Sequence, residues 1–190
     1  MEISTRSFWE LVHGMGFGGL YLLACSAAIV ELVRHYSPRE KSPVTDGDVL
    51  FLRSWLIAMA LIAWITVFTG AYVIYPWYRA VPPAGVGALH PFPQALLKSS
   101  AATIEWHSLG MEWKEHVAWF APISISMAAA IAVQYGRRLK ANAQLRTAVL
   151  AFVVVSLISA GIAGVFGAMI DEKAPVEGGP MINLRGDGGR

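Results

Sequence analysis

Two histidines, each close to a glutamate, are the side chains of this sequence that could do chemistry inside an apolar helix. His13 follows Glu10 by three residues near the start of the first apolar stretch, and His116 follows Glu112 by four at the start of the third. An ionisable side chain near the end of a membrane span marks a candidate functional site. Neutral imidazole is a common axial ligand of haem iron, so the pair predicts a haem or metal site.

Four long apolar helices must position these residues. The chain has 190 residues, of which 55% are hydrophobic and only 15% are charged. Four stretches exceed the roughly 18 apolar residues that mark a candidate membrane helix. The sequence predicts an all-α, polytopic membrane four-helix bundle over residues 1–170 and an extracytoplasmic C-terminal tail over 171–190. The expected spans are residues 8–33, 49–78, 112–136 and 148–170.

The basic residues predict the orientation of the bundle. The connections after the first and third spans carry their basic residues close to the span ends, which is typical of cytoplasmic loops. We therefore expect a multi-pass protein of the cell inner membrane, with both termini and the Pro-rich third connection on the extracytoplasmic side. The formal net charge is only +2, so no nucleic-acid partner is expected.

With this topology the two histidines lie at a similar depth. His13 is about five residues into the first span and His116 about four into the third, both counted from the outer face at roughly 1.5 Å per residue. Bundle cofactor sites are built from side chains on facing helices. We expect His13 and His116 to bind one b-type haem, with the glycine face around Gly16 against the macrocycle. His107, nearer the outer surface, is the alternative ligand.

The same residues leave other interpretations open. Gly14 and Gly18 have the spacing of a helix–helix packing motif, and interfacial histidines often only bind lipid head groups or water. The Glu-x-x-His spacing of Glu10 and His13 also occurs in di-iron bundles, so a small di-iron or copper site is an alternative. Glu10 and Glu112 could orient an imidazole, or carry protons at an outer-face quinol site.

Three further features are expected to be structural. Pro122 should kink the third span, because its ring cannot bond the Ala118 carbonyl. Lys114 and the neighbouring tryptophans should anchor the third span at the level of the lipid head groups. The tail after Asp171 is rich in Gly and Pro, and should be extended or disordered unless a partner holds it.

The arrangement resembles, in outline, the four- or five-helix b-type cytochrome subunits that anchor respiratory dehydrogenases and reductases. The resemblance rests on His13 in its glycine-rich turn, on His116 in the third span and on the size of the bundle. Those subunits usually bring four histidines and two haems, whereas this chain has only His35 at the cytoplasmic end.

The resemblance implies an electron-transfer subunit with one haem b. It would exchange electrons between the quinone pool and a periplasmic cytochrome or other redox protein, among lipid and other membrane subunits. Such a chain would be a non-catalytic or quinol-oxidising subunit of an oxidoreductase complex. The alternative is a cofactor-free structural subunit of a membrane complex.

Overall fold

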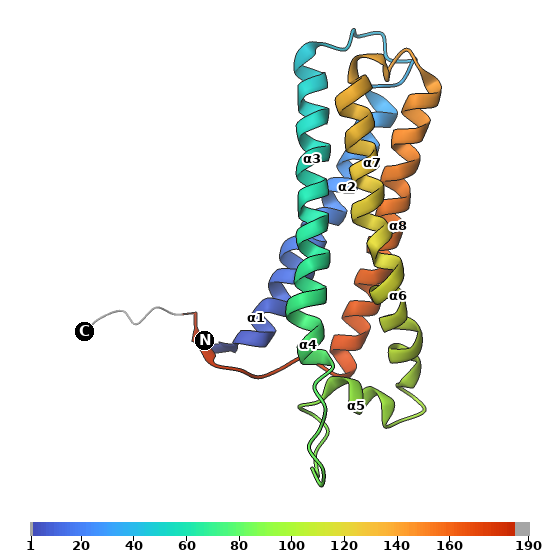
Figure 1. The fold of residues 1–190 in the computed structure, drawn as a ribbon. Coiled ribbons are helices and arrows are strands. Elements are labelled where there is room, and N and C mark those ends of the chain that lie inside the picture. The colour runs from blue at the N-terminus through green and yellow to red at the C-terminus, as the bar shows by residue number, and fades with distance from the viewer. Residues whose placement is uncertain (1, 185–190) are drawn as a thin grey trace, which may run out of the picture.

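The computed structural model describes residues 2–184 and forms a bundle of four long helical stretches (Figure 1). Each stretch has 30 to 33 residues and is long and apolar enough to cross a membrane. The mostly helical architecture with four candidate spans confirms the sequence analysis at this level. They are named here span one to span four: Thr5–Arg34, Asp46–Tyr78, Trp106–Arg138 and Ala143–Lys173.

Spans one and two are not uniform α-helices, because a π-helical segment interrupts each of them. The segment in span one lies between two α-helices, and the segment in span two precedes the last α-helical turn. The elements in order are α1 (Thr5–Leu11), π-helical η1 (Val12–Gly19), α2 (Leu20–Arg34), α3 (Asp46–Thr69), π-helical η2 (Gly70–Ile74) and α4 (Tyr75–Tyr78).

Span three is irregular in its first half, and span four is one continuous α-helix. A 3-10 turn follows His116 directly and precedes Pro122, whose ring cannot bond the Ala118 carbonyl. The elements are α5 (Pro93–Lys98) in the preceding connection, then π-helical η3 (Trp106–Met111), α6 (Glu112–His116), 3-10 η4 (Val117–Trp119), α7 (Phe120–Tyr135), 3-10 η5 (Gly136–Arg138) and α8 (Ala143–Lys173).

Polar side chains begin the helices that start in loops. Before α3, Thr45 Oγ1 accepts the N–H of Asp48, and the Asp48 carboxylate accepts the N–H of Thr45. Before α8, Asn142 Oδ1 accepts the N–H of Leu145. Each cap satisfies an N–H group that has no partner within its own helix.

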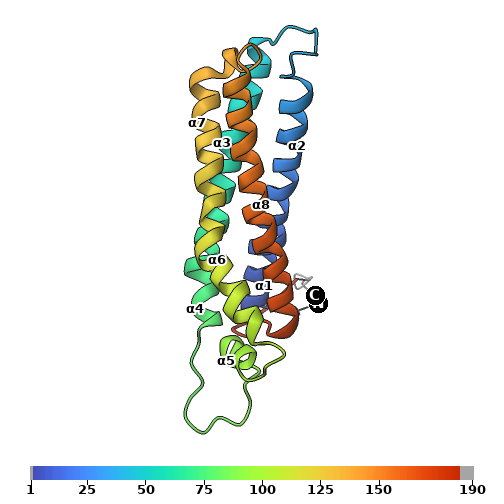
Figure 2. The ribbon, with the colours of Figure 1, turned by 90° about the vertical axis from the view of Figure 1, so that its right-hand side faces the viewer.

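The four spans form a ring in which each one packs on two neighbours. Helix α7 packs on α3 and α8, and α2 packs on α8 and α3. Spans one and three therefore occupy opposite corners, with α2 behind α7 in the view of Figure 1 (Figures 1 and 2). A group held by both spans would have to lie across the middle of the bundle.

Two clusters of buried apolar side chains stabilise the bundle. The larger cluster fills the half that ends in the two shorter connections, and the smaller one lies near the chain termini. The larger includes Tyr21, Cys25, Leu56, Ile125 and Val153, and the smaller is Tyr78, Leu97, Met111, Ile170, Ala174 and Val176.

The C-terminal tail is held by the N-terminus of the same chain. Helix α8 continues to Lys173, and the tail then runs back so that β2 (Met181–Asn183) pairs antiparallel with β1 (Glu2–Ser4). The Thr5 hydroxyl donates to the Pro180 carbonyl at 2.7 Å. The N-terminal strand β1 is thus the partner that holds the tail in an extended conformation. Residues 185–190 of the expected tail lie outside the described part.

The Ser156 hydroxyl connects three spans, so its loss should destabilise the bundle. It bonds the Tyr21 hydroxyl and donates to the Ala121 carbonyl at 2.6 Å, in a fully buried position. In Ser156→Ala the Tyr21 hydroxyl loses this partner, which we expect to lower the free energy of unfolding by about 1–3 kcal/mol. Thermal unfolding in a mild detergent measures the change.

Ser26→Ala is the matched control for this variant. Ser26 is exposed, and its hydroxyl donates to the Leu22 carbonyl of its own helix. Surface substitutions of this kind stay within about 0.5 kcal/mol. Equal unfolding midpoints for the two serine variants would contradict the connecting role of Ser156.

Candidate functional site

A group of polar side chains, called here the polar layer, lies beside the smaller apolar cluster. It contains Glu10 and His13 of span one, Thr69 of span two, Lys114 of span three and Asp171 of span four. Thr69 and Lys114 lie between residues of the two clusters along their spans, and Asp171 follows Ile170 of the smaller cluster. None of the residues of α1, η1, η2, α6 or η4 is fully buried. All four spans therefore contribute polar groups at one level, near the chain termini.

The ring of His13 is held by span two. Its Nδ1 lies 3.1 Å from Thr69 Oγ1, and that oxygen lies 2.8 Å from the Ile65 carbonyl. When the Thr69 hydroxyl donates to a carbonyl, its oxygen can accept the N–H of Nδ1, and in that tautomer Nε2 keeps a free lone pair.

Gly70 lets the ring approach the backbone of span two. A Cβ atom at Gly70 would lie 2.8 Å from His13 Cε1, which is closer than real Cβ atoms approach other groups. Glycine is thus the residue that this position requires. Span two fixes the ring of His13 by one hydrogen bond and one close backbone contact.

His116 lies near the same level but at the surface of the bundle. Its side chain is 69% exposed. Nδ1 donates to the Glu112 carbonyl at 3.1 Å and lies 3.3 Å from Glu112 Oε2. Trp119, one turn later, packs edge-on against Phe68, which precedes Thr69. Within residues 2–184, no hydrogen bond or ring contact joins His13 to His116.

His107 lies closer to the chain termini, as the sequence indicates. Its Nδ1 is 2.8 Å from the Tyr78 hydroxyl, and the two rings are 6.1 Å apart between centroids. Glu112 pairs with His116, and Glu10 lies beside Lys114 and Asp171 instead of at the His13 ring. The two glutamates therefore have different surroundings.

The glycine face of span one is open. A Cβ atom at Gly14 would meet nothing within 4 Å, and one at Gly16 would meet only atoms of the preceding turn. A Cβ atom at Gly18 would approach the His13 carbonyl of its own segment. No other described span covers these three positions, so a flat group or a second protein could lie against them.

Lys114 points into the bundle and is not the head-group anchor that the sequence suggested. A Cβ atom at Gly167 would lie 3.1 Å from Lys114 Nζ, so the ammonium rests on the glycine of α8. This ammonium interacts electrostatically with the carboxyl groups of Glu10 and Asp171, and with the ring of His13. In span three, Lys114 therefore occupies the interior position near His13.

Sequence reasoning missed the roles of Lys114 and Asp171, because they depend on how span three packs against span four. Gly110 precedes Lys114 by four residues and packs against Phe166 and Ile170 of α8. Residues four apart share a helix face, so Lys114 belongs to the face that contacts span four. His116 is two residues further on, or roughly 200° around the helix.

Irregular helix geometry accompanies all three candidate ligands. His13 lies within η1, His107 lies within η3, and η4 begins directly after His116. The segment η2 begins at Gly70, beside His13. π-Helical turns occur frequently at functional sites, because they re-aim side chains within a helix. The terminal half of the bundle is therefore the candidate site.

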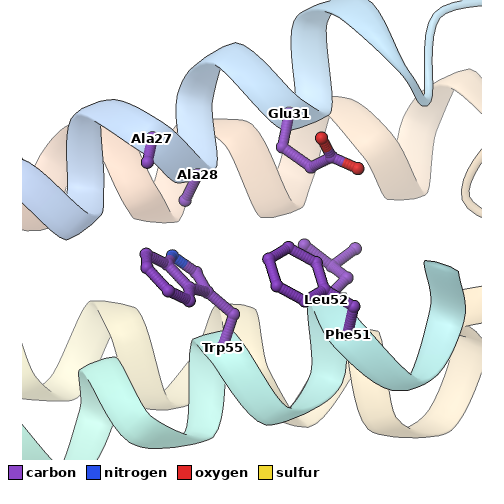
Figure 3. A pocket seen from close by; sticks show the side chains of 6 residues that line it. All are labelled: Ala27, Ala28, Glu31, Phe51, Leu52 and Trp55. Atoms are coloured by element: carbon purple, nitrogen blue, oxygen red, sulfur yellow. The ribbon is translucent and has the colours of Figure 1, made fainter. Parts of the chain in front are cut away.

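A pocket at the opposite end of the bundle contains no histidine. It lies between α2 and α3 and has a volume of about 170 Å³ (Figure 3). Its lining is mostly apolar and aromatic, with a single carboxylate. The lining residues are Ala27, Ala28, Glu31, Phe51, Leu52 and Trp55.

Within residues 2–184, no group of three or more His, Cys, Asp or Glu side chains could hold a metal ion. Cys25 is buried as a free thiol. No protein-family model, curated protein or solved structure matches the chain. The function must therefore be argued from the polar layer itself.

Gly70→Ala should displace the His13 ring, because the added methyl group would overlap Cε1. We expect the Nδ1 bond to Thr69 to weaken or break, which changes the nitrogen chemical shifts of the ring in histidine-labelled protein. Gly14→Ala is the matched control, since it lies next to His13 and a Cβ atom there meets nothing within 4 Å. Unchanged His13 shifts in Gly70→Ala would disprove the positioning role of Gly70.

Proposed function

We propose that the chain is a membrane-embedded electron-transfer subunit that binds one b-type haem through His13. His116 is the proposed second axial ligand, and His107 is its alternative. The subunit would exchange electrons between the quinone pool and a redox partner on the side of the chain termini. On this proposal the chain is an inner-membrane protein with both termini outside the cytoplasm, within a complex of other membrane subunits.

The hydrogen bond between His13 Nδ1 and Thr69 Oγ1 is the observation that carries the proposal. A histidine ligand commonly donates its second ring N–H to an oxygen, which fixes the ring and leaves the other nitrogen for the metal. His13 has this arrangement through Thr69. His116 has it through the carbonyl and the carboxylate of Glu112.

The residues present fit a haem iron at His13. Its Nε2 would supply a neutral imidazole ligand, Thr69 and Gly70 hold the ring, and the open glycine face leaves room for a flat group. A bound haem would supply one-electron redox chemistry. The chain would contribute the orientation of the imidazole and an apolar surrounding that tunes the potential.

One observation favours the second candidate function, a cofactor-free structural subunit. The His116 ring is 69% exposed and its contacts are with Glu112 of its own helix. Charged groups of spans one, three and four also interact electrostatically at Lys114. A bundle held in this way could serve assembly alone, with the open glycine face as an interface.

A redox difference spectrum of the purified chain tests the proposal. The wild type should show b-type absorbance together with about one iron per chain. His13→Ala should abolish both signals, because no other described side chain replaces its ligand position. His116→Ala should change the spectrum from that of a low-spin, six-coordinate haem.

His35→Ala is the control, since His35 pairs with Asp48 at the opposite end of the bundle, and its spectrum should match the wild type. A spectrum altered by His107→Ala and unaltered by His116→Ala would assign the second ligand to His107. Wild-type protein without iron or b-type absorbance would exclude the haem and leave the structural role.

A further inference from the structure

We propose that the pocket between α2 and α3 binds the head group of a phospholipid that carries a primary ammonium, such as phosphatidylethanolamine. The pocket lies at the end of the bundle away from the chain termini (Figure 3). Glu31 binds the ammonium, and Arg34 binds the phosphate of the same head group. The proposal requires that the spans cross a lipid bilayer, but it is independent of a haem at His13.

The pocket has the size of one small group. Its floor includes the buried Ala28 and Leu52, and the exposed ring of Phe51 stands at its rim. Glu31 and Trp55 are half-buried. The volume of about 170 Å³ is below the roughly 300–1,000 Å³ of pockets that enclose a whole small molecule. The pocket therefore suits the head group of a larger molecule whose remainder lies outside.

The polar end of the pocket lies where lipid head groups are expected. Glu31 is three residues before Arg34, the last residue of span one, or about 4.5 Å along the helix. Trp55 is nine residues after Asp46, the first residue of span two, or about 13.5 Å along it. Figure 3 shows the Glu31 carboxylate across from the Phe51 ring, towards the connecting loop. The pocket is thus polar near the span ends and apolar below, as a phospholipid is.

Two aromatic rings form the wall that faces α2. The rings of Phe51 and Trp55 are stacked, with their centroids 5.7 Å apart and their planes at 25°. The Trp55 indole N–H donates to the Ala24 carbonyl of α2 at 3.3 Å, which fixes this ring across the gap. The face of an aromatic ring attracts a cation. A cation in this pocket therefore meets aromatic rings on one side and the Glu31 carboxylate on the other.

The side chains of Glu31 and Arg34 form no ion pair within residues 2–184. They are three residues apart on one helix, and are therefore neighbours on its surface. The N–H groups of His35 and Tyr36 bond the backbone carbonyl of Glu31, so these bonds do not involve its carboxylate. A carboxylate and a guanidinium that do not pair with each other complement the ammonium and the phosphate of a zwitterionic head group.

The Glu31 carboxylate also selects the kind of head group. A primary ammonium has three N–H donors, and a carboxylate accepts them. The quaternary ammonium of phosphatidylcholine has no N–H, and phosphatidylglycerol brings a negative charge without an ammonium. The pocket therefore favours phosphatidylethanolamine over both of these lipids.

Native mass spectrometry of the delipidated wild-type chain in a mild detergent tests the proposal. Phosphatidylethanolamine, its N-acetylated derivative, phosphatidylcholine and phosphatidylglycerol are titrated separately, all with the same acyl chains. We expect phosphatidylethanolamine to bind about tenfold more tightly than the other three, because only its ammonium donates charged hydrogen bonds to Glu31. The N-acetylated lipid is the sharpest comparison, since it keeps the phosphate and loses only the ammonium.

Two charge variants assign the two halves of the head group. Glu31→Gln should abolish the preference for phosphatidylethanolamine and leave the binding of phosphatidylcholine unchanged. Arg34→Gln should weaken the binding of all four lipids, because each of them carries a phosphate. Glu40→Gln is the matched control for Glu31→Gln, since the exposed Glu40 lies in the connection that follows α2 and accepts the N–H of Ser42. It should bind the lipids as the wild type does.

A third variant tests the aromatic wall. Phe51→Leu keeps an apolar side chain at the rim but removes the aromatic face, so it should weaken phosphatidylethanolamine more than phosphatidylglycerol. Phe120→Leu is the matched control on span three, because Phe120 is 56% exposed and Phe51 is 55% exposed. Phe120→Leu should keep the wild-type preference.

Three outcomes would overturn the inference. They are equal binding of the four lipids by the wild type, tighter binding of phosphatidylglycerol than of phosphatidylethanolamine, and a preference that persists in folded Glu31→Gln. The comparison of lipids on the wild type does not depend on whether any variant folds. A preference for phosphatidylethanolamine in a chain that binds no haem would support the lipid site and still refute the proposed function.

Discussion

The electrostatic attraction between the Lys114 ammonium and the carboxyl groups of Glu10 and Asp171 is the interaction on which the terminal half of the bundle depends. Spans one and three stand at opposite corners of the ring, and Lys114 reaches from span three to Glu10 of span one and Asp171 of span four. Gly167 makes the contact possible, because a side chain there would meet the ammonium. A charge between apolar helices is costly unless opposite charges lie near it, so the ammonium requires these carboxyl groups.

The two halves of the bundle follow different packing rules. In the half with the larger apolar cluster, α2, α3, α7 and α8 are regular helices with small and branched side chains between them. In the terminal half, three π-helical segments and one 3-10 turn change the direction of successive side chains. Polar side chains lie there beside the smaller apolar cluster. Regular helices therefore form the frame, and irregular helices carry the candidate site.

The sequence was sufficient for the features that depend on local composition. Long apolar stretches predict the four spans, and Pro122 predicts an irregular turn in span three. His13 could be singled out because an imidazole beside an apolar helix is unusual. Thr69 and Gly70, which contact the His13 ring, could not be found in this way. Nothing in the sequence around them indicates that a histidine of another span lies beside them.

Other features could not be read from the sequence, for physical reasons. A lysine near a helix end can extend to the lipid head groups or point into the bundle. Lys114 can point inward because Gly167 of span four leaves space for its ammonium. The direction in which the His116 side chain points depends on the local helix geometry. A 3-10 turn follows His116, so side chains there do not point in the directions that a regular α-helix would give. The pairing of Ile3 with Ile182 joins positions at the two ends of the chain, for which no local pattern exists.

The pairing of β1 with β2 also has a consequence for how the chain is made. Synthesis starts at the N-terminus, so β1 must wait until the residues of β2 have emerged before its partner exists. Glu10 likewise meets Lys114 and Asp171 only after the third and fourth helices are available. Span one can therefore pack on span two early, but β1 gains its partner only after all four spans have been made.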